Sequence, residues 1–164
     1  MTLQVRAATD DDLDALAAMG AALAKLHQGW DAQRFSSKST DDVEDGYRWW
    51  FSKEIQRKGV CFRVAVDDDS DDDSDDLAGY IYGCKEGRDW NRLLDPHVEI
   101  VDVYVRHDRR HHGVGKALIE SFCAWAEKKK AGPVVLSTAA KNAEAQALFA
   151  SLGFRPTMIE MTRG

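Results

Sequence analysis

The sequence predicts a mixed α/β (α+β) domain, and three observations support this fold class. Strand-like and helix-like apolar patterns follow one another in the order β-α-α-β-β-β-α-β-α-β. The 164 residues are 44% apolar and 30% charged, which suits one domain over residues 1–164 with a sizeable core. Two strand patterns late in the chain are separated by a helix, and such strands pair in parallel. We therefore expect a mixed, mostly antiparallel sheet covered by helices.

The N-terminal part of the chain is predicted to form a short strand and two helices. Leu3–Ala7 alternates as a strand does, and Thr9 or Asp10 is placed to cap a helix that runs to about residue 27. A second helix is expected from a cap at residue 40 or 41 to about residue 58. It carries more aromatic side chains than one packing stripe needs, so part of them is predicted to face a pocket.

A run of eight aspartates and two serines, DDDSDDDSDD, occupies residues 67–76 between strand patterns at 60–66 and 77–82. This order predicts a hairpin with an expanded acidic tip. The run holds eight of the 28 acidic residues, which leaves 20 against 22 basic residues, so the formal charge of -6 is a local property. The acidity argues against nucleic acid as a partner. The tip is either a solvated loop or a region that attracts polycations.

The second half of the chain carries the strongest strand pattern. Residues 97–105 (HVEIVDVYV) predict a long strand, and residues 114–130 predict an amphipathic helix with lysines in its last turn. A short strand at 134–138, a helix at 142–152 and a final strand at 158–162 complete six strands and four helices.

A glycine-bearing turn joins that long strand to the helix after it, and it reads RRHHGVGK over residues 109–116. Such a turn directs the free N–H groups of a helix N-terminus at one point, where the helix dipole also attracts anions. The glycines let a phosphate approach the main chain, and the basic side chains raise the local positive potential. We therefore expect a polyphosphate site here. The GxxxxGK[ST] and GxGxxG patterns of other nucleotide loops do not fit.

Two segments resemble the GCN5-related N-acetyltransferase (GNAT) family. Residues 110–115 (RHHGVG) match its R/Q-x-x-G-x-G/A signature, which likewise follows a strand. Residues 142–154 (NAEAQALFASLGF) are similar to its N-x-x-A-x-x-L-[YF]-x-x-x-G-F segment. Because both matches occur in the family's order, the chain is identified as a member of this family.

The resemblance implies a sheet of six to seven strands flanked by about four helices, with a V-shaped splay into which the pantetheine of coenzyme A inserts. It implies acetyl-CoA as cofactor and a primary amine, of a small molecule or a protein, as acetyl acceptor. A homodimer joined through the terminal strand stays open. By position, the residues implied to contact the coenzyme are Val103, Tyr104, Val105, Arg110, His111, His112, Gly113, Val114, Gly115, Lys116, Asn142, Ala145 and Phe149.

Glu99 is the first candidate for the general base, and Asp102 is its rival. Glu99 lies six residues before Val105, where some family members that acetylate protein lysines carry a catalytic glutamate. Strand alternation places Glu99 on the face of Val103 and Val105, unless a β-bulge intervenes. Asp102 lies on the opposite face. Either carboxylate is expected to act through water, since an unshifted carboxylate near pKa 4 is a weak proton acceptor.

Phe149 departs from the family pattern, because many members have a tyrosine there that protonates the leaving thiolate. A thiol of pKa about 8.5 leaves as thiolate at a cost of about 2 kcal/mol at neutral pH, so the loss is bearable. Solvent, Tyr104 or Ser151 are the candidates to supply the proton. The departure keeps an alternative open, a non-catalytic acyl-CoA-binding module. A third reading is an interaction protein that works through the acidic tip.

The acceptor end is less determined by the sequence. The resemblance implies an acceptor pocket between the first two helices and nearby loops, and its candidate wall residues are His27, Trp30, Tyr47, Trp50 and Trp90. Aromatic rings bind alkyl chains and ammonium groups, although such residues also serve as core.

The three cysteines and the hydropathy predict the setting of the domain. Cys61, Cys84 and Cys123 show no CxxC or CxxH spacing, so we predict neither a disulfide framework nor a metal site. No apolar run approaches the roughly 18 residues that span a bilayer, and residues 1–10 lack the order of a signal peptide. We therefore expect a cytoplasmic protein with no membrane partner.

Overall fold

A computed structural model describes residues 2–35, 42–67 and 76–164 of the chain. In these ranges five strands form one sheet in the order β1-β2-β3-β4-β5. They are β1 (Leu3–Ala7), β2 (Val60–Asp67), β3 (Leu77–Glu86), β4 (His97–Val105) and β5 (Val134–Leu136). The first four pair antiparallel and β5 pairs parallel to β4, as the order of helices and strands predicts.

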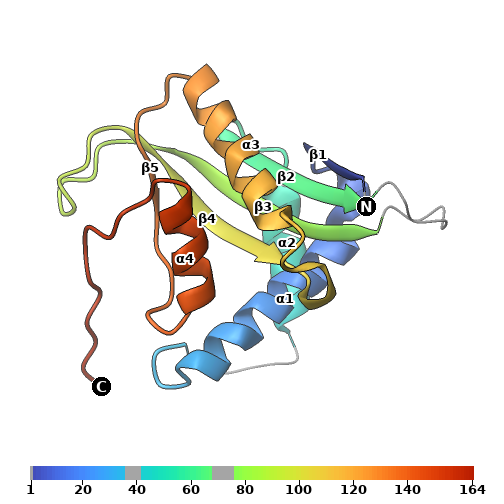
Figure 1. Cartoon of the computed structure of the whole chain (residues 1–164), viewed down its shortest axis with the longest axis horizontal. Helices are drawn as coiled ribbons and strands as arrows, with labels where there is room; N and C mark the ends of the chain where they lie inside the picture. The colour runs from blue at the N-terminus through green and yellow to red at the C-terminus, as the bar shows by residue number, and fades with distance from the viewer. Residues whose placement is uncertain (1, 36–41, 68–75) are drawn as a thin grey trace.

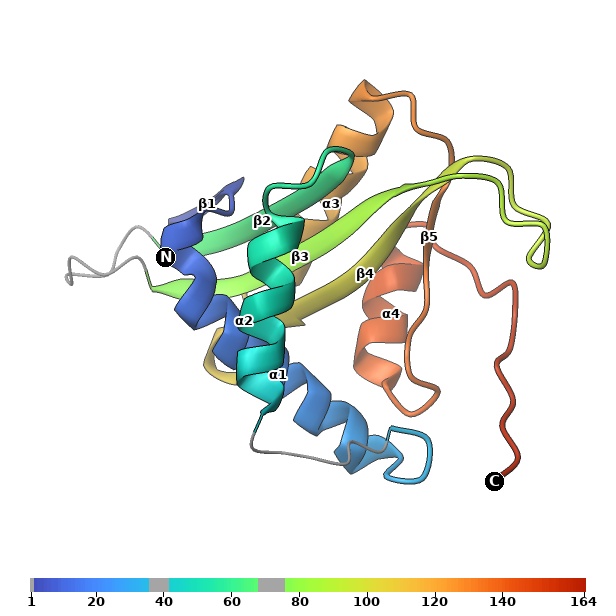
Figure 2. The ribbon, with the colours of Figure 1, turned by 180° about the vertical axis from the view of Figure 1, so that it is seen from behind.

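Four α-helices cover the two faces of this sheet. They are α1 (Leu13–Trp30), α2 (Val43–Glu54), α3 (Val114–Lys128) and α4 (Ala143–Ser151), and the short 3-10 helices Asp10–Asp12 and His107–Arg109 precede α1 and α3. Helices α3 and α4 lie over one face (Figure 1), and α1 and α2 lie over the other (Figure 2). The predicted mixed architecture is thus confirmed.

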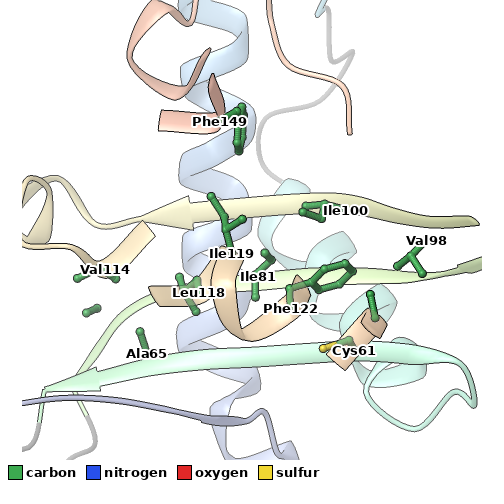
Figure 3. Close-up of a cluster of buried hydrophobic side chains, with 12 residues drawn as sticks. Cys61, Ala65, Ile81, Val98, Ile100, Val114, Leu118, Ile119, Phe122 and Phe149 are labelled. Carbon is green, nitrogen blue, oxygen red and sulfur yellow. The ribbon is translucent and has the colours of Figure 1, made fainter. Parts of the chain in front are cut away.

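Each face has its own core. On the α3 face, aliphatic side chains of the strands meet Leu118, Ile119 and Phe122, and Phe149 of α4 joins the same cluster (Figure 3). On the α1 and α2 face the core is aromatic, with Phe51 packed against Phe62, Tyr80 and Tyr82. Burial of these side chains is the main favourable contribution to folding, at about 1.5–3 kcal/mol each.

The predicted sheet of six to seven strands is wrong, because the described residues form five. Residues 158–162 are not a strand, and Met158, Ile159 and Met161 are exposed. Pro156 precedes this segment and has no N–H to donate to a ladder. The segment runs beside the sheet without joining it (Figures 1 and 2), and Glu160 instead pairs with Arg34 at 2.5 Å.

Several boundaries differ from those expected. Helix α2 ends at Glu54 and β5 ends at Leu136, both earlier than predicted, whereas β3 continues to Glu86. The expected cap of α2 at residue 40 or 41 lies outside the described residues, as do residues 68–75 of the aspartate run. The two strands that flank the run, β2 and β3, pair antiparallel from Val60 opposite Cys84 to Val66 opposite Leu77, which confirms the hairpin. None of the described helices is long and apolar enough to cross a membrane.

Candidate functional site

Strand β4 changes register in its middle. Tyr82 of β3 faces Asp102, but the next residue, Gly83, faces Ile100, so Val101 is an extra residue on β4. Paired residues share a face, and the bulge therefore moves Glu99 to the face of Asp102, opposite Cys84. The face of Val103 and Val105 was expected for Glu99 only in the absence of a β-bulge, and the bulge places Glu99 on the other face.

The C-terminal half of β4 has an open edge. Strand β5 pairs with β4 only at Val98, Glu99 and Ile100, so from residue 101 onward no described strand continues this edge. On the other edge, the N–H of Arg106 donates to the carbonyl of Ala78 at 3.0 Å. Main-chain groups alternate between the two edges, so those of Tyr104 point to β3 and those of Val103 and Val105 point to the opening. Val103 and Val105 thus offer main-chain groups to a ligand, whereas Val103, Tyr104 and Val105 were all expected to do so.

The turn after β4 leads into α3 through Gly113, whose φ of 80° is the left-handed conformation that glycine adopts without strain. The first backbone hydrogen bond of α3 runs from Ala117 N–H to Gly113 O at 3.0 Å. The N–H groups of Val114, Gly115 and Lys116 therefore have no acceptor within the helix. A Cβ at Gly115 would lie 3.0 Å from Leu148 Cδ2, so a larger residue would crowd the gap between α3 and α4.

A cavity of about 330 Å³ lies where these features meet, and we call it the cofactor cavity. It is lined by all the predicted coenzyme contacts except His112. The Nδ1 atom of His112 is instead 2.7 Å from Arg110 O, on the exposed side of the turn. The lining residues are Leu23, Leu26, Trp30, Val103, Tyr104, Val105, Arg109, Arg110, His111, Gly113, Val114, Gly115, Lys116, Asn142, Glu144, Ala145, Leu148 and Phe149.

Five lining residues are not among the predicted coenzyme or acceptor contacts: Leu23, Leu26, Arg109, Glu144 and Leu148. Leu23 and Leu148 lie on the apolar stripes of α1 and α4, where a pocket residue has the same pattern as a core residue. Arg109 belongs to the basic turn, which was the available signal. Nothing in the sequence singles out Leu26 or Glu144.

The arginines of the turn have different partners. Arg109 pairs with Asp67 at 2.7 Å and with Asp76 at 2.8 Å, and Arg106 pairs with Asp76 and Asp108. The two ends of the aspartate run are therefore held against the turn. Arg110 instead donates from Nε to the carbonyl of Val105 at 3.2 Å.

Helix α4 supplies the other wall of the cofactor cavity. The side-chain oxygen of Asn142 accepts a hydrogen bond from Ala145 N–H at 3.2 Å and caps the helix, which leaves the NH₂ group of Asn142 for a ligand. At the mouth, His111 Nε2 lies 3.4 Å from Glu144 Oε1. Phe149 is buried and contacts both the cavity and the α3-face core.

Asp102 is a partly buried carboxylate on the α1 and α2 face. Burial raises its pKa to about 6, although the hydrogen bond from the Tyr80 hydroxyl (3.3 Å) and the proximity of His27 act in the opposite direction. Burial and the charge of Asp102 also raise the pKa of Tyr47 to about 12. Tyr80 and Tyr47 therefore stay protonated near neutral pH, while Asp102 can take up or release a proton.

Glu99 has a different environment, on the paired half of β4. Its carboxylate accepts from Arg92 Nη1 at 3.1 Å and lies 3.8 Å from His97 Nε2. His97 is buried, and its Nδ1 is 2.9 Å from the carbonyl of Asp95. These contacts hold Glu99 under the loop between β3 and β4, at the end of β4 remote from the turn at residues 109–116.

The predicted acceptor residues fall into three groups. Trp30 lines the cofactor cavity, and His27 packs edge-on against it at 5.1 Å. Tyr47 and Trp50 belong to the aromatic core with Phe51. Trp90 is 75% exposed on the loop before β4, where Arg88 stacks on its ring, and it is absent from the described walls of the cavities. The structure therefore does not bring Trp90 to the site.

The comparisons with known proteins agree with this geometry. The model of the acetyltransferase (GNAT) family matches residues 23–154, so the chain belongs to the acetyltransferase (GNAT) family. No curated protein sequence matches the chain.

Solved structures show the same fold. A GCN5-related N-acetyltransferase from Ralstonia eutropha JMP134 has a TM-score of 0.73 at 21% identity, covering 99% of this chain and 98% of that one. The paia N-acetyltransferase from Thermoplasma acidophilum, solved with coenzyme A, has a TM-score of 0.74 at 18% identity, covering 100% and 94%. AAC(6')-Iy, solved with the bisubstrate analogue CoA-S-monomethyl-acetylneamine, has a TM-score of 0.71 at 16% identity, covering 100% and 98%.

Proposed function

We propose that this chain is an acetyl-CoA-dependent N-acetyltransferase that works as a single domain on a primary amine. The observation that carries the proposal is the cofactor cavity, where an open strand edge and a helix N-terminus with free N–H groups face one space. Family membership supports it, and two proteins of the same fold were solved with coenzyme A or a coenzyme A conjugate.

The residues present fit the coenzyme. The N–H groups of Val114, Gly115 and Lys116, together with Arg110, would hold the diphosphate at the positive end of α3. The main-chain groups of Val103 and Val105 would bond the pantetheine amides as a neighbouring strand does. The list of coenzyme contacts is completed by His111, Gly113, Asn142, Ala145 and Phe149.

Bound acetyl-CoA would supply a thioester: the amine nitrogen bonds to its carbonyl carbon, the carbon–sulfur bond breaks, and coenzyme A leaves as the thiol. The chain must take one proton from the amine. Deprotonation at pH 7 costs roughly 4.6 kcal/mol for an amine of pKa about 10.4 and about 1.4 kcal/mol for an α-amine whose pKa is near 8. A proton acceptor near the acceptor nitrogen is therefore needed most by alkyl amines.

We assign the proton acceptor to Asp102, acting through water. Its pKa of about 6 makes it a better acceptor than an ordinary carboxylate, and it remains ionised at neutral pH. It adjoins Val103 in sequence and lies on the α1 and α2 face, from which the acceptor would approach past His27 and Trp30. Glu99 is occupied by Arg92 and is the weaker candidate.

Tyr104 is the proposed source of the proton for the thiolate. Its residue lines the cofactor cavity, whereas Phe149 has no proton to donate. The Ser151 hydroxyl already donates its proton to the carbonyl of Leu148 at 2.7 Å, which disfavours it.

The test is release of free thiol from acetyl-CoA across polyamines, aminoglycosides, amino acids and peptides. Steady release that depends on one amine class is the expected result. Tight acetyl-CoA binding with no thiol release for any class would instead favour a non-catalytic acyl-CoA-binding module, the reading that Phe149 keeps open. Absence of coenzyme binding would contradict both.

A further inference from the structure

A second cavity adjoins the cofactor cavity, and two of its lining residues, Lys25 and His107, have no role in the proposed reaction. It has a volume of about 500 Å³ and lies between α1 and the segment that follows β4. We call it the α1 groove. Its lining residues are Ala22, Lys25, Leu26, Gly29, Trp30, Tyr104, His107 and Arg110. Leu26, Trp30, Tyr104 and Arg110 line both cavities, so one ligand can extend from one into the other.

The charged residues of the α1 groove all have basic side chains. Lys25 and Arg110 carry a positive charge, and no Asp or Glu is among the described lining residues. Neither Lys25 nor Arg110 pairs with a carboxylate of any described residue. By contrast, the nearby Arg106 and Arg109 are neutralised by Asp67, Asp76 and Asp108.

The selective neutralisation has a consequence for the ligand. Asp67 and Asp76 pair with Arg106 and Arg109, neither of which lines the α1 groove, whereas Lys25 and Arg110 line it without a carboxylate partner among the described residues. Unpaired cations at the edge of an apolar floor formed by Ala22, Leu26 and Trp30 attract an anion and repel an ammonium group. The groove therefore has the opposite polarity from a polycation site.

We propose that the α1 groove is a subsite for an anionic group, a carboxylate or a phosphate, on a ligand that also occupies the cofactor cavity. The inference rests on the proposed function to the extent that this ligand is the coenzyme or the acceptor. Two sources of the anion have the same chemistry: the 3′-phosphate of coenzyme A, or a carboxylate or phosphate on the acceptor amine. If the acceptor supplies the anion, the acceptor is an amine that also carries a carboxylate or a phosphate.

The test reverses one charge of the groove with Lys25→Glu and compares it with Lys53→Glu, an exposed lysine of α2 outside both cavities. Calorimetry would give the Kd of coenzyme A and of 3′-dephospho-coenzyme A for each variant. If the coenzyme supplies the anion, Lys25→Glu weakens coenzyme A binding about tenfold and leaves the dephospho form unchanged. Lys53→Glu changes neither beyond about twofold.

If the acceptor supplies the anion, both coenzyme affinities stay the same. Lys25→Glu then raises KM about tenfold for amines with a free carboxylate or phosphate and leaves KM for their methyl esters unchanged. A third readout is independent of the enzyme activity: inorganic phosphate should shift the amide NMR signals of Gly29 and His107 in the wild type and not in Lys25→Glu. If Lys25→Glu matches Lys53→Glu in all three measurements, the proposal is overturned, whether or not the chain transfers acetyl groups.

Discussion

The two halves of β4 differ more than their sequence suggests. Residues His97 to Ile100 pair on both edges, and the one carboxylate among them, Glu99, is held by Arg92. Residues 101–105 pair on one edge only, and the carboxylate there, Asp102, has a pKa raised by burial to about 6. The paired half therefore has the features of a structural support, and the open half those of a reactive centre.

The bulge at Val101 separates these two halves. It restores the register needed for Ile100 to fill the α3-face core while Val103 and Val105 keep the same face. As a result, both carboxylates face α1 and α2, but only Asp102 belongs to the stretch of β4 that β5 does not pair with. Two carboxylates on one strand can therefore have different roles, because the hydrogen-bond partners and the burial of each carboxylate decide its pKa.

The largest effect should come from Asp102→Asn. This substitution removes the proposed proton acceptor while keeping the shape of the side chain and the contact with Tyr80. We expect kcat to fall about 100-fold to 1000-fold for alkyl amines, with the Kd for coenzyme A unchanged. Stopped-assay kinetics and calorimetry measure the two quantities. A variant that retains more than about half of its activity would show that Asp102 is not the base.

The phosphate-binding end of the open half can be tested with Gly113→Asp and its matched control, Gly113→Asn. Both introduce a side chain at a φ of 80°, which Asn tolerates better than most residues, but only Asp adds a negative charge beside the free N–H groups. We expect the Asp variant to bind coenzyme A about 100-fold more weakly than wild type and the Asn variant less than about tenfold more weakly. Equal affinities for Asp and Asn variants would remove the anion site from this turn.

The pH dependence distinguishes Asp102 from an unperturbed carboxylate. Because the carboxylate must be ionised to accept a proton, kcat/KM should fall as the pH drops through about 6. The Tyr80 hydroxyl stabilises the charged form, so Tyr80→Phe should raise the pKa of Asp102 and move this limb to higher pH, by up to about one unit. A limb near 4 in the wild type, or no movement in the variant, would argue against Asp102.

The smallest effect on activity is expected for Glu99→Gln. The proposed chemistry does not use Glu99, so kcat should stay within about threefold of wild type. Loss of the half-buried ion pair with Arg92 should instead lower the free energy of unfolding by up to about 1 kcal/mol, measured by urea denaturation at pH 7. A large loss of kcat without a loss of stability would reverse the roles assigned to the two halves.

The sequence predicted the open half through its backbone chemistry. Gly113 and Gly115 between a strong strand and a strong helix indicate an anion site on physical grounds, and the structure places both on the cofactor cavity. The element order was predictable for the same reason, since apolar periodicity is local.

Other features depend on contacts that a pattern does not encode. The sequence allowed for a bulge in this strand but did not locate it, because Val101 is an apolar strand residue like Ile100 and Val103. Only the pairing of Tyr82 with Asp102 and of Gly83 with Ile100 reveals it. Trp90 was assigned to the acceptor pocket from its residue type, whereas its loop lies at the far end of β4. The predicted terminal strand is absent from the structure because residues 158–162 bury no side-chain face against the sheet.

The most direct test of the central claim is an amide NMR titration of the full chain with coenzyme A. The open edge and the turn should bind it, so the N–H signals of Val103, Val105, Gly113, Gly115 and Lys116 should shift strongly. The signals of Val98, Glu99 and Ile100, whose edge is already paired with β5, should hardly move. Equal shifts in both halves of β4, or shifts that spare the turn at Gly113, would contradict the account.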